Sequence, residues 1–197
     1  MPRLPFRARQ LAAGGRERPM VALVGFMGAG KTSVGRALAR RLRWRFVDLD
    51  DVIVERERRS VAELFEASEA VFRRAESAAL RAVLAQRVAG GLVLALGGGA
   101  FVQPRNAGLL ARAGVPVVFL DAQPDELLAR CRASGVERPL LRGQNQFRQL
   151  YGERRVRYMR ADVRIDTGAR SIAQVAARVH QWLRWRARDS SAAKEYS

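Results

Sequence analysis

The segment 24–33, VGFMGAGKTS, constrains the fold of this chain more than any other. It contains the full pattern GxxxxGK[ST], in which closely spaced glycines let backbone amides converge on phosphate oxygens. The apolar run 20–25 before it is typical of a buried parallel strand, and Val34, Leu38 and Leu42 after it repeat at helical spacing. A strand, a glycine loop and a helix in this order predict a site for the phosphates of a nucleoside triphosphate.

Lysine is almost absent from the chain, which makes its position in the loop informative. Among 36 cationic side chains only Lys31 and Lys194 are lysines, and a compact ammonium reaches into a tight phosphate loop where a planar guanidinium fits poorly. We expect Lys31 to bridge phosphates and take part in catalysis, and the Thr32 hydroxyl to bind Mg²⁺. The predicted ATP-binding residues of the loop are Gly28, Ala29, Gly30, Lys31, Thr32 and Ser33.

Short apolar segments alternate with helical patterns along the rest of the chain. A second strand is expected to end at Asp48, and further strands are expected within residues 91–100, 115–121 and 162–166. Helical patterns cover residues 61–87, with a break around 67–69, and residues 171–186. This alternation predicts an α/β fold with three layers, a doubly wound, parallel five-stranded sheet that binds ligands at the carboxyl ends of its strands.

Length and composition indicate a single domain. At 197 residues the chain suits one core, which we place at residues 19–187, between a basic disordered leader at 1–18 and a disordered tail at 188–197. No apolar run is long enough to span a membrane, so we expect a cytoplasmic protein. The arginine-rich leader also suits an organelle transit peptide, a less favoured alternative.

The net charge of +17 raises the question of nucleic-acid binding. The arginines are spread along the whole chain, and no known nucleic-acid-binding motif is present, so we expect no nucleic-acid partner. A single cysteine, Cys131, and a single histidine, His180, argue against a metal centre built from thiolates or imidazoles.

Two carboxylates follow the second predicted strand. Asp48 and Asp50 lie two residues apart, so they are expected to project into the same region beside the phosphate loop. One can hold the Mg²⁺ shell and the other can accept a proton from a hydroxyl nucleophile. Asp51 fits the alternative role of capping the next helix better than either of them.

Four further motifs accompany the phosphate loop: FRRAE at 72–76, GGG at 97–99, ERPLL at 137–141 and ERRVRY at 153–158. With these motifs in this order, the chain resembles the shikimate kinase family over about residues 20–182. The resemblance implies ATP-dependent phosphorylation of the 3-hydroxyl of shikimate, giving shikimate 3-phosphate and ADP. It also implies a monomeric P-loop kinase of the nucleoside monophosphate kinase type, with Mg²⁺ and a mobile lid at about residues 132–148.

The resemblance also implies residue roles in the acceptor site. Asp50 is similar to the carboxylate that binds the shikimate hydroxyls and is the candidate base, while Asp48 resembles the partner of Thr32 in the Mg²⁺ shell. Arg73 and Arg154 resemble the pair that binds the substrate carboxylate, and a guanidinium meets a carboxylate with two parallel hydrogen bonds.

Further residues carry roles by the same resemblance. Glu76 resembles the residue that orients Arg73, and the triple glycine lines the acceptor through Gly97, Gly98 and Gly99. Arg138 resembles a catalytic lid arginine that also contacts ATP, and Arg130 a nucleotide-binding arginine. Because the family often has Arg-x-Pro-Leu-Tyr where this chain has residues 154–158, a slip of one position would exchange Arg154 for Arg155.

Two other functions remain open from the sequence. A different small-metabolite kinase, such as a gluconate kinase, would share the phosphate loop and the fold. A non-catalytic sensor with a kinase fold is expected to lack a phosphate-loop or acceptor residue, and no such residue is missing here.

Overall fold

The computed structural model describes residues 19–86, 90–133 and 143–195, in which strands and helices alternate. The strands are β1 Met20–Val24, β2 Arg45–Asp48, β3 Leu92–Ala95, β4 Val117–Asp121 and β5 Val163–Asp166. The helices are α1 Lys31–Leu42, α2 Leu49–Glu57, α3 Val61–Ala67, α4 Glu69–Ala85, α5 Pro104–Arg112, α6 Pro124–Ala133, α7 Gln144–Tyr158 and α8 Ile172–Glu195.

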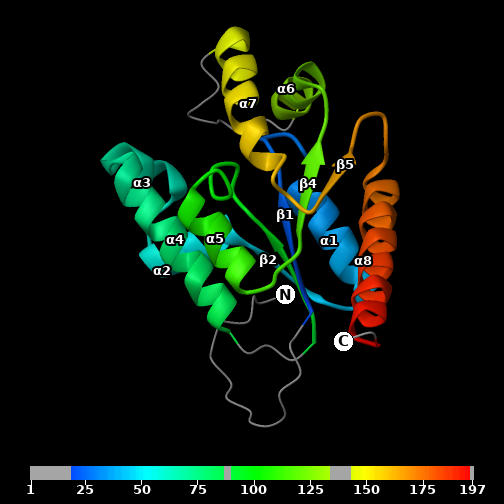
Figure 1. Ribbon diagram of the computed structural model, residues 1–197. Coiled ribbons are helices and arrows are strands. Elements are labelled where there is room, and N and C mark those ends of the chain that lie inside the picture. The colour runs from blue at the N-terminus through cyan, green and yellow to red at the C-terminus, as the bar shows by residue number, and fades with distance from the viewer. Residues whose placement is uncertain (1–18, 87–89, 134–142, 196–197) are drawn as a thin grey trace, which may run out of the picture.

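All five strands are parallel and form one sheet in the order β2-β3-β1-β4-β5. Helices cover both sides of this sheet in Figure 1, where α1 packs on α8 and, across the sheet, α4 packs on α2 and α5. The predicted α/β fold with a five-stranded parallel sheet is therefore confirmed. Because the strands are parallel, their carboxyl ends bring the loops after β1, β2 and β3 to the same edge.

The predicted break in the helical pattern of residues 61–87 has a local cause. Ser68 is extended, with φ −179° and ψ 139°, and its side chain accepts a hydrogen bond from the backbone of Ala70. It therefore ends α3 and caps α4. One helix earlier, Ser60 and Glu63 form a capping box, in which each side chain accepts a hydrogen bond from the other's backbone amide.

Two expectations about helix boundaries are wrong. Helix α8 continues to Glu195, beyond its expected end near residue 186. Residues 187–195 contain neither glycine nor proline, so no residue there stops a helix. The start of α2 also differs from the expectation. Asp48 rather than Asp51 caps this helix, and Asp50 lies in its first turn rather than at the end of the strand.

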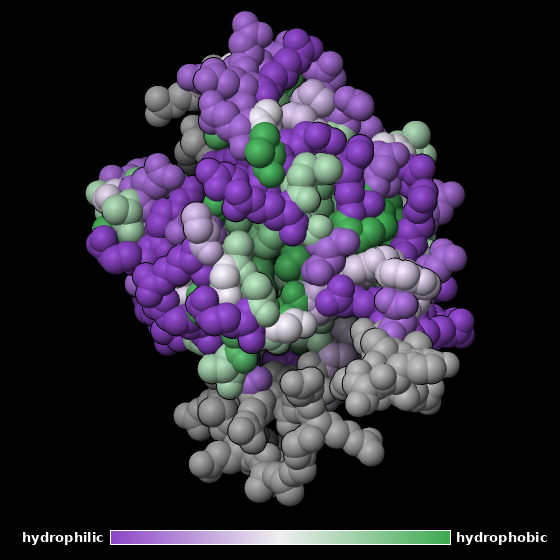
Figure 2. All heavy atoms as spheres, viewed as in Figure 1, coloured by the Kyte–Doolittle hydropathy of each residue, from purple (hydrophilic) through white to green (hydrophobic). Residues whose placement is uncertain are grey.

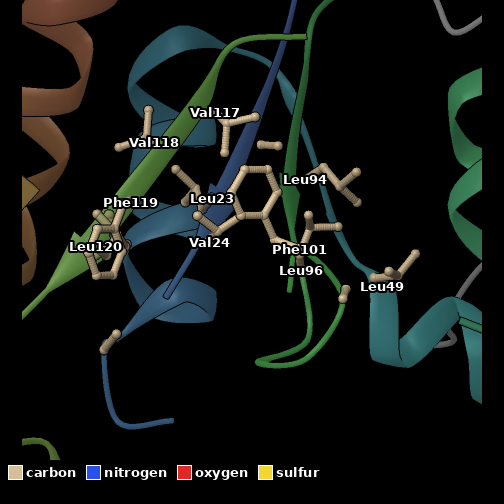
Figure 3. Close-up of a cluster of buried hydrophobic side chains, with 14 of the residues drawn as sticks. Leu23, Val24, Leu49, Leu94, Leu96, Phe101, Val117, Val118, Phe119 and Leu120 are labelled. Carbon is tan, nitrogen blue, oxygen red and sulfur yellow. The ribbon is translucent and has the colours of Figure 1, made fainter. Parts of the chain in front are cut away.

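The core lies where the three middle strands meet the helices. Leu23, Leu94 and Phe119, from β1, β3 and β4, are fully buried and converge in Figure 3 with residues from neighbouring loops and α2. Continuous apolar strands of this kind require helices on both faces, which explains the layers. Within the described ranges, no helix is both long and apolar enough to cross a bilayer.

Candidate active site

A cavity of about 790 Å³ opens at the carboxyl ends of β1, β2 and β3. The predicted site residues line two sides of this cavity, one for the nucleotide and one for the acceptor. The nucleotide side is lined by Gly28, Ala29, Gly30, Lys31, Thr32, Ser33 and Arg130. The acceptor side is lined by Asp48, Asp50, Arg73, Glu76, Gly97, Gly98, Gly99 and Arg154. The structure thus brings every described residue of the predicted site into one cavity.

The phosphate loop lies between β1 and α1. Gly28 and Gly30 have φ values of +80° and +83°, a left-handed backbone conformation that glycine adopts without steric cost. The Lys31 ammonium donates hydrogen bonds of 3.0 Å to the backbone carbonyls of Gly25 and Phe26. Because α1 begins at Lys31, its amino end, which is the positive end of the helix dipole, faces the cavity.

Asp48 joins the phosphate loop to α2. The Thr32 hydroxyl donates to Asp48 Oδ2 at 2.8 Å, and the backbone amide of Asp50 donates to Asp48 Oδ1 at 3.2 Å. One carboxylate therefore caps α2 and contacts the predicted Mg²⁺ ligand Thr32. In the part of the chain that the structure describes, no cluster of three or more His, Cys, Asp or Glu side chains can hold a metal ion by itself.

Arg73 lies at the opposite wall, between two glutamates of its own helix. It donates to the carboxylate of Glu76 at 3.1 Å and to that of Glu69 at 3.1 Å, and the rings of Phe65 and Phe72 lie 5.5 and 5.3 Å from its guanidinium carbon. The i,i+3 pair with Glu76 that the sequence predicted is therefore present. Stacked aromatic rings and carboxylates on two sides limit the positions available to the guanidinium.

Glu76 is a buried carboxylate behind Arg73. Its removal from water raises its pKa to about 7, although the charge and hydrogen bonds of Arg73 favour the ionised form. Gln103, at the amino end of α5, also donates to Glu76 Oε2. Sequence reasoning missed Gln103, because an uncharged residue in front of a proline carries no signal for such a contact.

The triple glycine lets the backbone approach the side chains that are predicted to bind the acceptor. A Cβ added to Gly97 would lie 2.7 Å from Asp50 Oδ1, and one added to Gly99 would lie 2.2 Å from Arg73 Nη1. Both distances are far shorter than a van der Waals contact. Any larger residue at these two positions would displace the side chains predicted to bind the acceptor.

Two neighbouring arginines of α7 point to different partners. Arg154 lines the cavity, and its Nη1 lies 3.4 Å from the carbonyl oxygen of Gly98. Arg155 instead donates to the buried carboxylate of Asp121 at 3.2 Å. The geometry therefore favours Arg154 over Arg155 as the residue of the acceptor site.

Arg130 and the lid are placed only in part. Arg130 lines the nucleotide end of the cavity and donates to the Thr167 side chain and backbone at 3.0 and 2.8 Å and to Glu126 at 2.6 Å. Arg138 and most of the predicted lid, as well as the leader 1–18, lie outside the described residues. The hydrophobic wall of the cavity, which includes Val61, Phe65, Phe72 and Ile172, was not singled out from the sequence.

The sequence also matches a known family over most of its length. The family model described as shikimate kinase matches residues 27–184, which contain all the predicted site residues. The chain belongs to the shikimate kinase family. It is therefore an ATP-dependent kinase that phosphorylates the 3-hydroxyl of shikimate.

Individual relatives agree with this assignment. A shikimate kinase from Geobacter sulfurreducens is 43% identical over 168 residues, which cover 83% of this chain and 90% of the relative. The solved structure of a shikimate kinase from Acinetobacter baumannii in complex with shikimate has a TM-score of 0.76 and 33% identity, covering 84% of this chain and 93% of that one. The shikimate kinase fold predicted from the motifs is therefore confirmed.

The gluconate kinase alternative receives less support. A gluconokinase from Sinorhizobium meliloti has a TM-score of 0.58 and 19% identity over 87% of this chain, which shows a shared fold alone. The non-catalytic alternative predicted that a phosphate-loop or acceptor residue would be missing. Within the described residues, the cavity has the predicted phosphate-loop residues on its nucleotide side and the predicted acceptor residues on its acceptor side.

Proposed function

We propose that this shikimate kinase transfers its phosphoryl group within the cavity described above, with Asp50 as the general base. Asp50 accepts the proton of the shikimate 3-hydroxyl, whose oxygen bonds to the γ-phosphorus while the bond to the bridging oxygen of ADP breaks. The observation that carries this proposal is that Asp50 and the phosphate loop line the same cavity. A carboxylate that lines this cavity beside Gly97 is suitably located for this proton transfer.

Arg73 and Arg154 bind the shikimate carboxylate in this proposal. They line the same cavity, and Gly99 lies against Arg73 while Gly98 lies beside Arg154. Two guanidinium groups offer paired donors that match the planar carboxylate. Holding the carboxylate at this wall directs the ring hydroxyls toward Asp50.

Lys31 contributes on the nucleotide side. Its ammonium is held by the backbone carbonyls of Gly25 and Phe26, and we infer that it moves from them to phosphate oxygens when ATP binds. Arg130 contacts the nucleotide, and Arg138 contacts the transferred group from the lid.

Thr32 and Asp48 fit a Mg²⁺ site. A hydroxyl and a carboxylate 2.8 Å apart are oxygen donors of the kind that Mg²⁺ prefers, and Mg²⁺ in nucleotide kinases takes its remaining ligands from phosphates and water. A larger cluster of acidic side chains is therefore not required. When bound, Mg²⁺ neutralises charge on the phosphate oxygens.

We further propose that the enzyme acts as a monomer in the cytoplasm. Hydrophilic residues dominate the face seen in Figure 2, and the exposed large apolar side chains of the described ranges include Val54, Val156 and Trp185, from three different helices. Single exposed apolar residues of this kind do not require a partner surface.

The acceptor assay tests the chemistry directly. ADP release is measured with Mg²⁺ and ATP in the presence of shikimate, gluconate or no acceptor. We expect release that depends on shikimate and matches the shikimate 3-phosphate formed. Release with gluconate alone, or equal release without an acceptor, would contradict the proposed use of the cavity.

A further inference from the structure

Phe26, in the phosphate loop, is a buried aromatic residue that faces α7. Its ring makes edge contacts with Phe147 at 5.0 Å and with Tyr151 at 5.7 Å between centroids. Both partners lie on α7, and Phe26 is fully buried among them. The loop that binds phosphate is therefore packed directly onto the helix that carries Arg154.

The same ring also lies beneath the guanidinium of Arg154. The Arg154 guanidinium carbon is 5.8 Å from the Phe26 ring centroid, within the range of a cation–π interaction. Positions 147, 151, 154 and 158 share one face of α7, since they are spaced by three or four residues. The aromatic contacts and Arg154 thus belong to one surface of the helix.

The polar contact of Arg154 is weak by comparison. Its Nη1 reaches the Gly98 carbonyl at 3.4 Å, beyond the usual length of a charge-assisted hydrogen bond. That carbonyl also accepts a hydrogen bond from the Tyr158 hydroxyl. The Tyr158 hydroxyl also interacts with Arg154, so the Phe26 ring is one of the contacts, together with Gly98 and Tyr158, that place the guanidinium.

We propose that Phe26 is a positioning residue for the acceptor, holding Arg154 toward the shikimate carboxylate through its ring and its packing on α7. The proposal rests on the function proposed above for Arg154. Phe26 also accepts a hydrogen bond from Lys31 through its backbone carbonyl. One residue of the phosphate loop therefore contacts a nucleotide-binding side chain with its backbone and an acceptor-binding side chain with its ring.

If Phe26 only packed in the hydrophobic core, its substitution would have a different effect from the one that the positioning role predicts. Loss of packing alone would lower the amount of folded enzyme, and KM does not depend on that amount. It would also affect all acceptors alike. A positioning role acts through the acceptor carboxylate, so it should disappear when that carboxylate is masked as the methyl ester.

The experiment measures KM for shikimate and for methyl shikimate in Phe26→Leu, Arg154→Ala and the double variant. We expect Phe26→Leu to raise the shikimate KM by about five- to tenfold and to change the methyl shikimate KM little. In the Arg154→Ala background, Phe26→Leu should add no further increase. Phe147→Leu, which removes the helix side of the same contact, should act in the same direction as Phe26→Leu.

Phe46→Leu is the matched control. Arg36 lies over the Phe46 ring at 5.6 Å, and neither residue lines the cavity, so the shikimate KM should stay at the wild-type value. If Arg154→Ala raises the shikimate KM but Phe26→Leu and Phe147→Leu do not, the positioning role is wrong and the proposed function stands. If Phe26→Leu raises the KM of both acceptors equally, the ring does not act through the acceptor carboxylate, and the positioning role is wrong. If Arg154→Ala has no effect, both proposals fail.

Discussion

The guanidinium of Arg73 donates to the Glu76 carboxylate at 3.1 Å, and the Glu76 side chain is only 1% exposed. A buried, desolvated carboxylate therefore orients the Arg73 guanidinium, which also lines the cavity. The same burial that orients the arginine raises the pKa of Glu76 to about 7. This pair connects acceptor binding with the pH dependence of stability.

Glu76→Gln should change how stability varies with pH. Because the pKa of Glu76 is about 7 in the folded enzyme and 4.5 as a reference, the folded state keeps a proton that the unfolded state releases. The stability that the protonated Glu76 contributes is thus fully present below pH 4.5 and is lost as pH rises to 7. From pH 4.5 to 8, wild type should lose about 3 kcal/mol relative to Glu76→Gln. Urea unfolding of both proteins measures this difference, and parallel pH profiles would contradict it.

Gly99→Ala should impair acceptor binding without unfolding the enzyme. A Cβ at this position would lie 2.2 Å from Arg73 Nη1, the end of a flexible side chain that can move away. We expect the shikimate KM to rise about tenfold or more, with the KM for ATP and the unfolding midpoint nearly unchanged. Gly108→Ala is the control, since Gly108 lies beside the Arg112 guanidinium on α5 outside the cavity. An unchanged shikimate KM in Gly99→Ala would remove Gly99 from the acceptor site.

Asp50→Asn should lower kcat while preserving nucleotide binding. The amide has nearly the shape of the carboxylate but cannot accept the hydroxyl proton, and general-base catalysis typically contributes about 10²- to 10⁴-fold. ATP affinity should remain close to wild type, because the phosphate loop is unaltered. Rapid-quench measurement of phosphoryl transfer, together with calorimetric titration of ATP, checks both parts. Full retention of kcat would exclude Asp50 as the base.

Arg155→Gln should behave as a stability variant. Arg155 contacts buried Asp121, which retains a hydrogen bond from Tyr151 and an ion pair with Arg164 when Arg155 is lost. We expect the free energy of unfolding to fall by about 1 kcal/mol, with the shikimate KM unchanged. A large increase in that KM would indicate that Arg155, not Arg154, contacts the acceptor.

The sequence predicted the parts of the site that carry a spacing or charge signal. The glycines and Lys31 of the phosphate loop and the break at Ser68 follow from local rules. The pair of Arg73 and Glu76 was implied by the family resemblance, and its i,i+3 spacing permits the contact. Local rules did not separate Asp48 from Asp51 as the helix cap, because both are good capping residues and only the end of β2 decides between them. The roles of Gln103 and the Phe26 ring depend on α5 and α7 packing against distant segments, which no local pattern encodes.

The most direct test of the account compares kcat/KM for shikimate and methyl shikimate in wild type, Arg73→Gln and Arg154→Gln. If the two arginines bind the acceptor carboxylate, wild type should prefer shikimate by about 10²-fold or more, and each variant should lose most of that preference. The variants should act mainly on shikimate and much less on the ester. Wild-type enzyme that uses both acceptors equally well, or variants that keep the full preference, would contradict the account.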